Sequence, residues 1–140
     1  DIVMSHVLEH LGKDTETYFC ILKEMYRVCA DQAIIQINVP HPRHDFFIDD
    51  PTHVRPITPN CINLLSKKQN DYWVEIGASN TQLGYILDVD FEITHTELVP
   101  DEEWVVKIRE QSMSPQELHA ASRKHNNVVQ EYRMTVKVIK

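Results

Sequence analysis

The pattern of the first forty residues constrains the fold of this chain more than any other feature. A short apolar run over 1–5 is followed by an amphipathic segment over 14–29 and a second apolar run over 33–39 that stops at Pro40. An apolar run that follows an amphipathic helix is typical of a βαβ unit, whose two strands are parallel. Asp14 is a suitable N-cap for the helix. The apolar positions of that helix recur at helical spacing: Tyr18, Phe19, Leu22, Met25, Tyr26 and Cys29.

The remaining residues predict further alternation of helices and strands within a single domain over 1–140. Four prolines make 40–58 a long irregular loop, which α/β proteins place at the carboxyl edge of the sheet where ligands bind. After this loop we expect a helix from Thr58 to about Lys68, a short strand or extended loop over 72–77, a short helix over 81–87, a strand over 91–99, a turn over 100–103, a short strand or helix over 104–108, a helix from Ser114 to about Asn126 and a last strand over 128–139.

Several short sequence motifs resemble those of a known family. An acidic residue opens the first strand, His-Val-Leu-Glu-His-Leu follows it over 6–11, Glu-Met-Tyr-Arg-Val ends the helix over 24–28, and Asn-Val-Pro ends the second strand over 38–40. Together these motifs resemble the second half of a class I S-adenosylmethionine-dependent methyltransferase domain of the methyltransferase type 11 kind. The resemblance implies an α/β fold with a partial Rossmann-like sheet, strands four to seven, in which the last two strands are antiparallel and helices pack on the sheet.

The resemblance also implies a function and a cofactor. The parent enzyme would transfer the methyl group of S-adenosylmethionine to an oxygen or nitrogen of a small-molecule acceptor. None of the three glycines forms a Gly-x-Gly loop after a strand, and Asp1 rather than Met opens the sequence. We therefore expect a truncated domain that alone binds no S-adenosylmethionine.

Without a neighbouring strand, the strand over 1–5 would be an apolar edge of the sheet, through which we expect the chain to self-associate.

The resemblance places Ser5, His6 and Val7 beside the methionyl part of the cofactor. The loop over 40–58 and the aromatic segment after it offer acceptor-side candidates. A general base near an acceptor is most often a histidine, for which His10, His41 and His53 are candidates. Arg55 could hold a carboxylate or phosphate of the acceptor, and Trp73 could line its pocket.

The segment His6-Val-Leu-Glu9-His10 permits a further interpretation, as a divalent-metal site formed by His6, Glu9 and His10 with a loop histidine. The sequence of this segment also matches the inverted zinc-protease motif. That motif requires a full helix, whereas here a predicted strand precedes the segment and Gly12 follows it. Some methyltransferases hold a cation with a similar Glu-x-x-Glu-His box, in which Glu stands where this chain has His6. Imidazole favours transition metals over magnesium. The structural alternative is that Glu9 and His10 pair locally.

The composition argues against several classes of protein. The net charge of −7 argues against a nucleic-acid-binding surface, and no apolar run approaches the length of about 20 residues that spans a bilayer. The three cysteines, Cys20, Cys29 and Cys61, are odd in number and widely spaced, which favours reduced thiols and a cytoplasmic location. Two alternatives to the enzyme stay open: a non-catalytic methyltransferase-like module that acts through protein association, and a His/Glu metal-binding protein.

Overall fold

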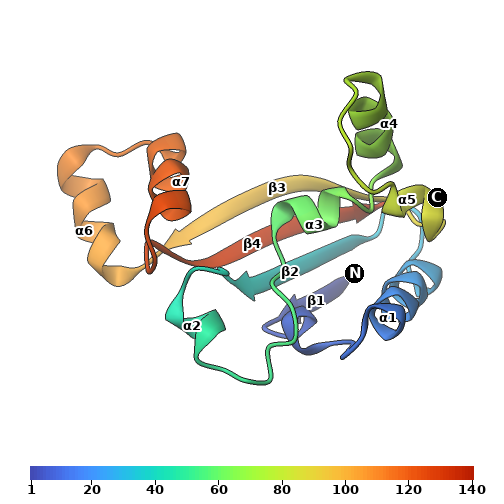
Figure 1. Ribbon diagram of the computed structural model, residues 1–140, viewed down its shortest axis with the longest axis horizontal. Helices are drawn as coiled ribbons and strands as arrows, with labels where there is room; N and C mark the ends of the chain where they lie inside the picture. Colours follow the sequence, from blue (N-terminus) through green and yellow to red (C-terminus); the bar gives the residue numbers. More distant parts are fainter.

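The computed structural model describes residues 1–140 and contains one four-stranded sheet with helices packed on it (Figure 1). The strands are β1 (Ile2–Ser5), β2 (Ile34–Pro40), β3 (Phe91–Pro100) and β4 (Val129–Val138). The helices are the 3-10 turn η1 (Leu8–His10), α1 (Thr15–Val28), α2 (Asp45–Ile48), α3 (Pro59–Asn63), α4 (Lys67–Glu75), α5 (Leu83–Ile86), α6 (Glu102–Gln111) and α7 (Pro115–Lys124).

The strand order is β1-β2-β4-β3, with β1 parallel to β2 and β4 antiparallel to both of its neighbours. The last strand of the chain therefore inserts between the second and the third. This arrangement confirms the predicted α/β fold, including the parallel first pair and the antiparallel last pair. The carboxyl ends of β1 and β2 meet at the same edge of the sheet, where the turn after β1 and the loop after β2 both begin.

Only one face of the sheet is apolar and covered. Along β4 the buried residues alternate with partly exposed or exposed ones, as expected for a strand with one face in the core and one in contact with solvent. Leu22 of α1 and Ile62 of α3 pack on the covered face against Ile37 and Val136. On the other face polar side chains interact with each other, for example Thr135 with Gln36.

The local capping signals explain where the helices begin. Asp14 accepts a hydrogen bond from the backbone N–H of Thr17 at the start of α1, as predicted. Thr58 caps α3 in the same way, followed by Pro59 at the first helical position. Ser114 forms a complete capping box at α7. The hairpin of α6 and α7 closes over a small separate core at one end of the sheet (Figure 1).

The prediction of a short strand or extended loop over 72–77 is wrong. The helix expected from Thr58 to Lys68 is in fact two helices, because Ser66 accepts a hydrogen bond from the backbone N–H of Gln69 and begins a new helix there. That second helix, α4, continues to Glu75 and ends before Gly77, whose φ of 72° suits glycine. Residues 104–108, expected to be a strand or helix, belong to α6.

The strand β1 lies at the edge of the sheet, as the sequence predicted for residues 1–5. The side chain of Val3 on this strand is 72% exposed. Self-association through this edge stays a prediction. No helix of the protein combines the length and the apolar character that crossing a membrane requires.

Candidate functional site

The candidate site begins where β1 ends, at a tight turn that buries a carboxylate. The backbone N–H of His6 still donates to Asn38 of β2, at 2.9 Å, but His6 itself adopts a left-handed conformation with φ 54°. The chain then turns through η1, which Leu8 anchors in the core with no exposed surface. The next residue on that turn, Glu9, is also completely buried.

The loop that follows β2 folds back onto this turn and is pinned to it by polar contacts. The backbone N–H of Val54 donates to the carbonyl of Glu9 at 2.9 Å. The guanidinium of Arg55 donates to the carbonyls of Leu11 and Gly12 at 3.0 and 2.7 Å. It also stacks on the ring of Tyr18, 3.9 Å from the ring centroid. The loop therefore holds His53 directly over the turn.

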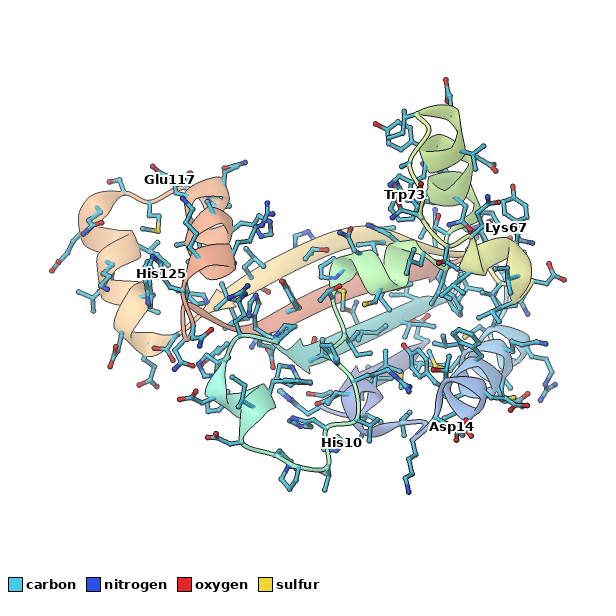
Figure 2. All side chains as sticks on the ribbon, viewed as in Figure 1. His10, Asp14, Lys67, Trp73, Glu117 and His125 are labelled. Carbon is cyan, nitrogen blue, oxygen red and sulfur yellow. The ribbon has the colours of Figure 1, made fainter.

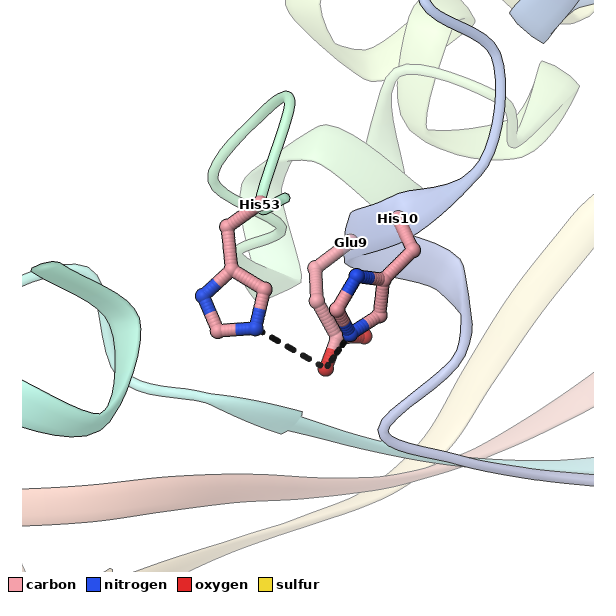
Figure 3. Close-up of side chains that lie close together, drawn as sticks. All are labelled: Glu9, His10 and His53. Atoms are coloured by element: carbon pink, nitrogen blue, oxygen red, sulfur yellow. Dashed lines mark ion pairs between the residues drawn. The ribbon is translucent and has the colours of Figure 1, made fainter. Parts of the chain in front are cut away.

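These contacts bring three potential metal ligands together at the carboxyl edge of the sheet. Each of Glu9, His10 and His53 offers one ligand atom, and the three atoms lie within 4.8 Å of one another. The Nε2 atoms of His10 and His53 are 3.9 and 4.0 Å from Oε1 of Glu9 (Figure 3). Both distances are too long for hydrogen bonds. The two imidazoles thus face the carboxylate without bonding to it.

Neither carboxylate oxygen of Glu9 has a hydrogen-bond partner. They are the only buried side-chain nitrogen or oxygen atoms in the protein in this condition. Leaving a buried charged group unpaired costs more than the roughly 1–3 kcal/mol typical of a neutral one. The turn therefore places in the interior a carboxylate whose nearest basic partners are the imidazoles of His6, His10 and His53, 3.6 to 4.0 Å away.

The tautomer of each imidazole follows from the partner of its other nitrogen. Nδ1 of His53 lies 2.8 Å from the carbonyl oxygen of Phe47, which can only accept, so Nδ1 carries the proton. Nδ1 of His10 lies 3.0 Å from the hydroxyl oxygen of Thr52. That hydroxyl donates its single proton to Asp50 at 2.6 Å, so the imidazole must donate to it. In both neutral rings the unprotonated Nε2 points at Glu9.

His6 lies beside this group but is bound elsewhere. Its Nε2 is 2.6 Å from Oε2 of Glu131 on β4, and its Nδ1 is 3.6 Å from Oε1 of Glu9. Its side chain is 47% exposed. The predicted set of His6, Glu9 and His10 with a loop histidine is thus only partly brought together: His53 is the loop histidine, and His6 lies outside the group.

The structure places the other two loop histidines away from this group. His41 is 5% exposed, its ring packs 4.9 Å from that of Tyr132, and its Nδ1 accepts from the backbone N–H of Arg43. Burial, reinforced by the positive charges of nearby His44 and Arg43, lowers the pKa of His41 from 6.5 to about 4. His44 is bonded to Asp101 at the start of α6.

The remaining predicted site residues are dispersed. The guanidinium of Arg55 is occupied by backbone carbonyls and a ring, so its role in the structure is to hold the loop. Trp73 lies on α4, which projects from the opposite side of the molecule from His10 (Figure 2). Ser5 and Val7 flank His6 at the end of β1 and are exposed.

A cavity of about 970 Å³ lies between α3, α6, α7 and the strands β3 and β4. It does not include the histidine group. Its lining includes Asn60, Leu98, Leu118, His119 and Tyr132. Sequence reasoning did not identify Thr52 and Asp50 as partners of His10: the spacing of Asp50 and Thr52 predicts only the hydrogen bonds between these two residues, and the contact with His10 joins residues 42 positions apart.

Comparison with solved structures gives a structural likeness. No protein-family model and no curated protein matches the sequence. The chain is similar to a solved structure described as a SAM dependent methyltransferase from Archaeoglobus fulgidus, with 23% identity and a TM-score of 0.49. The likeness covers 96% of this chain and 57% of that protein. The chain therefore spans little more than half the length of that structure.

Proposed function

We propose that this chain forms the acceptor side of an S-adenosylmethionine-dependent methyltransferase that methylates an oxygen or nitrogen of a small molecule. The observation that carries the proposal is the strand arrangement: the first two strands are parallel and the last two are antiparallel. The family resemblance implies an antiparallel last pair for strands four to seven, and the sequence pattern predicts the parallel first pair. The His-Val-Leu-Glu-His text directly follows the first of these strands, which supports the same assignment.

The residues present offer only part of a cofactor site. S-adenosylmethionine supplies a methyl carbon bound to a positively charged sulfur. Ser5, His6 and Val7 could form one wall beside it, and His6 is already bonded to Glu131. The two glycines with positive φ, Gly12 and Gly77, follow η1 and α4 rather than a strand. These residues do not fit a complete cofactor site, so we derive no step of the reaction through the cofactor.

On the acceptor side, the proposal assigns His10 and His53 to the acceptor rather than to the cofactor. In the neutral rings the unprotonated Nε2 atoms face the carboxyl edge, where ligands of α/β sheets bind. His10 is partly open to solvent, with 34% of its side chain exposed, so an acceptor can reach it. His41 is a poorer candidate, because it is buried and bonded to the backbone.

Two measurements test this function. Equilibrium dialysis with labelled S-adenosylmethionine should show no binding by the 140-residue chain and micromolar binding by a protein that starts further upstream in the same reading frame. In that longer protein, His10→Ala and His53→Ala should lower kcat by more than they lower cofactor affinity. Micromolar binding by the 140-residue chain, or equal loss of both quantities in the variants, would contradict the proposal.

We also propose that the chain self-associates through β1. An edge strand has unpaired backbone groups, and exposed Val3 gives this one an apolar side chain. Light scattering over a wide concentration range should show a concentration-dependent increase in mass that Val3→Lys reduces. A monodisperse monomer throughout would exclude this association. It would equally weigh against the alternative of a non-catalytic module that acts through protein contacts at this edge.

A further inference from the structure

We propose that Glu9, His10 and His53 bind one divalent transition-metal ion, with Zn²⁺ or Co²⁺ as suitable probes. The inference goes beyond methyl transfer and does not depend on it, because all three ligands lie within the described chain. The site is formed by the buried end of η1 and by the loop that Arg55 pins over it.

The first argument is the charge of Glu9. Its two carboxylate oxygens are fully buried and have no hydrogen-bond donor. Buried carboxylates in proteins are normally paired with a cation, bonded to donors or coordinated to a metal. No lysine or arginine forms an ion pair with Glu9. A metal ion bound at this point would supply the missing positive charge.

The second argument is the direction of the lone pairs. Because the Nδ1 protons of His10 and His53 are donated to Thr52 and Phe47, the Nε2 lone pairs of both rings point at Oε1 of Glu9. With both rings neutral, three electron-pair donors therefore face one another. Ligand atoms bound tetrahedrally to one ion at about 2.1 Å lie about 3.4 Å apart. The observed separations from Glu9, 3.9 and 4.0 Å, are about 0.5 Å longer, so a small movement of the side chains toward one another brings them to ligand distances.

The contacts behind the ligands also suit a metal site. A histidine that binds a metal through one nitrogen usually donates its other N–H to a carbonyl or carboxylate, which fixes the ring. His53 donates to the carbonyl of Phe47, and His10 donates to the hydroxyl of Thr52, which in turn donates to Asp50. Each imidazole is therefore already oriented in the absence of an ion.

The competing explanation is that a protonated His6 neutralises Glu9. Its Nδ1 is 3.6 Å from Oε1, beyond hydrogen-bond distance, and its Nε2 is bonded to Glu131. Such a contact would leave both oxygens of Glu9 without a hydrogen bond. Nε2 of His53 also lies 3.7 Å from Oδ2 of Asp50, which is likewise beyond hydrogen-bond distance. The two explanations predict different effects of His6 substitution on metal affinity.

The donor set selects the kind of ion. Two imidazole nitrogens and one carboxylate oxygen suit Zn²⁺, Fe²⁺, Co²⁺ or Ni²⁺, whereas Mg²⁺ and Ca²⁺ prefer oxygen ligands throughout. Three protein ligands leave at least one coordination position open, as in catalytic rather than structural sites. The exposed side of the His10 ring, 34% of the side chain, lets an ion and a further ligand enter.

Calorimetric titration of the metal-free 140-residue chain with Zn²⁺ tests the site directly. We expect saturable binding with a stoichiometry near one, and no saturable binding of Mg²⁺. Glu9→Gln, His10→Ala and His53→Ala should each weaken zinc binding at least about 100-fold, the upper end of what loss of a supporting hydrogen bond costs. The matched control is His125→Ala, an exposed histidine at the end of α7, far from His10 (Figure 2), which should leave the affinity unchanged.

Three outcomes would overturn the proposal. These are no saturable binding of Zn²⁺ or Co²⁺, an equal effect of His125→Ala and His53→Ala, or a 100-fold loss in His6→Asn. If a ligand variant does not fold by circular dichroism, Co²⁺ spectra of the unaltered chain decide instead. Nitrogen and oxygen ligation without a thiolate-to-cobalt band supports the site, whereas such a band would assign the metal to cysteine. Because no S-adenosylmethionine is present, failure here leaves the methyltransferase proposal intact, and the converse holds.

Discussion

Two histidines on the loop after β2 each face a carboxylate, but only one of the two pairs forms a hydrogen bond. Nδ1 of His44 accepts from the backbone N–H of Phe46, so its Nε2 carries the proton and donates to Asp101 at 3.0 Å. Nδ1 of His53 donates to the carbonyl of Phe47, so Nε2 of the neutral ring has no proton to give to Glu9, 4.0 Å away.

The difference between the two pairs lies in one backbone partner. A backbone N–H next to Nδ1 places the ring proton on the side of the carboxylate and completes a stabilising contact between the loop and α6. A backbone carbonyl next to Nδ1 instead places a lone pair on that side of the neutral ring. The pair of His44 and Asp101 therefore stabilises the fold, whereas the pair of His53 and Glu9 belongs to the proposed metal site.

The largest expected effect concerns His41, which has the same Nδ1 arrangement as His44 and contacts no carboxylate. Its pKa is lowered to about 4 by burial, whereas the unfolded chain takes up this proton near 6.5. The unfolded state therefore binds more protons between these values, and stability should fall as the pH decreases from about 6.5 to about 4. The slope from this group is at most about 1.4 kcal/mol per pH unit.

Urea unfolding at several pH values measures this slope. In His41→Asn, whose side-chain oxygen can still accept from the N–H of Arg43, the slope over that interval should become shallower than in the unaltered chain. The matched control is His95→Asn on β3, which is exposed and should leave the slope unchanged. An unchanged slope in His41→Asn would show that this histidine is not kept neutral by the fold.

The next effect tests the completed pair. In His44→Asn the shorter side chain can still cap α2, but it no longer reaches Asp101. A hydrogen bond to a charged group contributes about 1.5–3 kcal/mol, so we expect a loss of about 2 kcal/mol in the free energy of unfolding. The pKa of Asp101, lowered mainly by the bond from His44, should rise toward its ordinary value. Urea unfolding and a titration followed by NMR measure the two quantities.

Much of this fold could be predicted because its signals are local. The apolar runs over 1–5 and 33–39, the cap at Asp14 and the Thr58-Pro59 pair each act within a few residues, and the structure confirms them. The start of a new helix after Ser66 was not predicted, because the helical pattern of polar and apolar residues continues through this position and Ser66 is one of several residues there that could cap a helix.

The site could be predicted only in part, because its geometry depends on contacts distant in sequence. Glu9 and His10 could be predicted from the local sequence motif. Which of His41, His44 and His53 joins them depends on how the loop returns over η1. That path is set by Arg55 on the carbonyls of Leu11 and Gly12, 44 and 43 residues earlier in the chain. No spacing within the loop distinguishes the three histidines.

A smaller effect is expected at Thr52, whose hydroxyl fixes the tautomer of His10. Thr52→Val keeps the shape of the side chain and removes this oxygen, so the Nδ1 proton of His10 loses one acceptor. Loss of such a supporting partner should weaken zinc binding about tenfold. Thr96→Val, on an exposed part of β3, is the matched control in the same calorimetric titration. Equal affinities in the two variants would mean that Thr52 does not position the ring.

The smallest effect reverses the usual direction, because it should raise stability. In Glu9→Gln an amide replaces the unpaired carboxylate, and its N–H groups can donate to the bare Nε2 atoms of His10 and His53. Relief of a buried unpaired group should raise the free energy of unfolding of the metal-free chain by about 1 kcal/mol. Glu131→Gln, at a carboxylate already bonded to His6 and Arg133, should instead leave stability unchanged or lower it.

Saturating zinc should reverse the order of stability of Glu9→Gln and the unaltered chain, because only the unaltered chain is stabilised by binding the ion. Thermal unfolding with and without zinc measures both orders, and a Glu9→Gln variant less stable than the unaltered chain without metal would show that the carboxylate contributes to the fold after all.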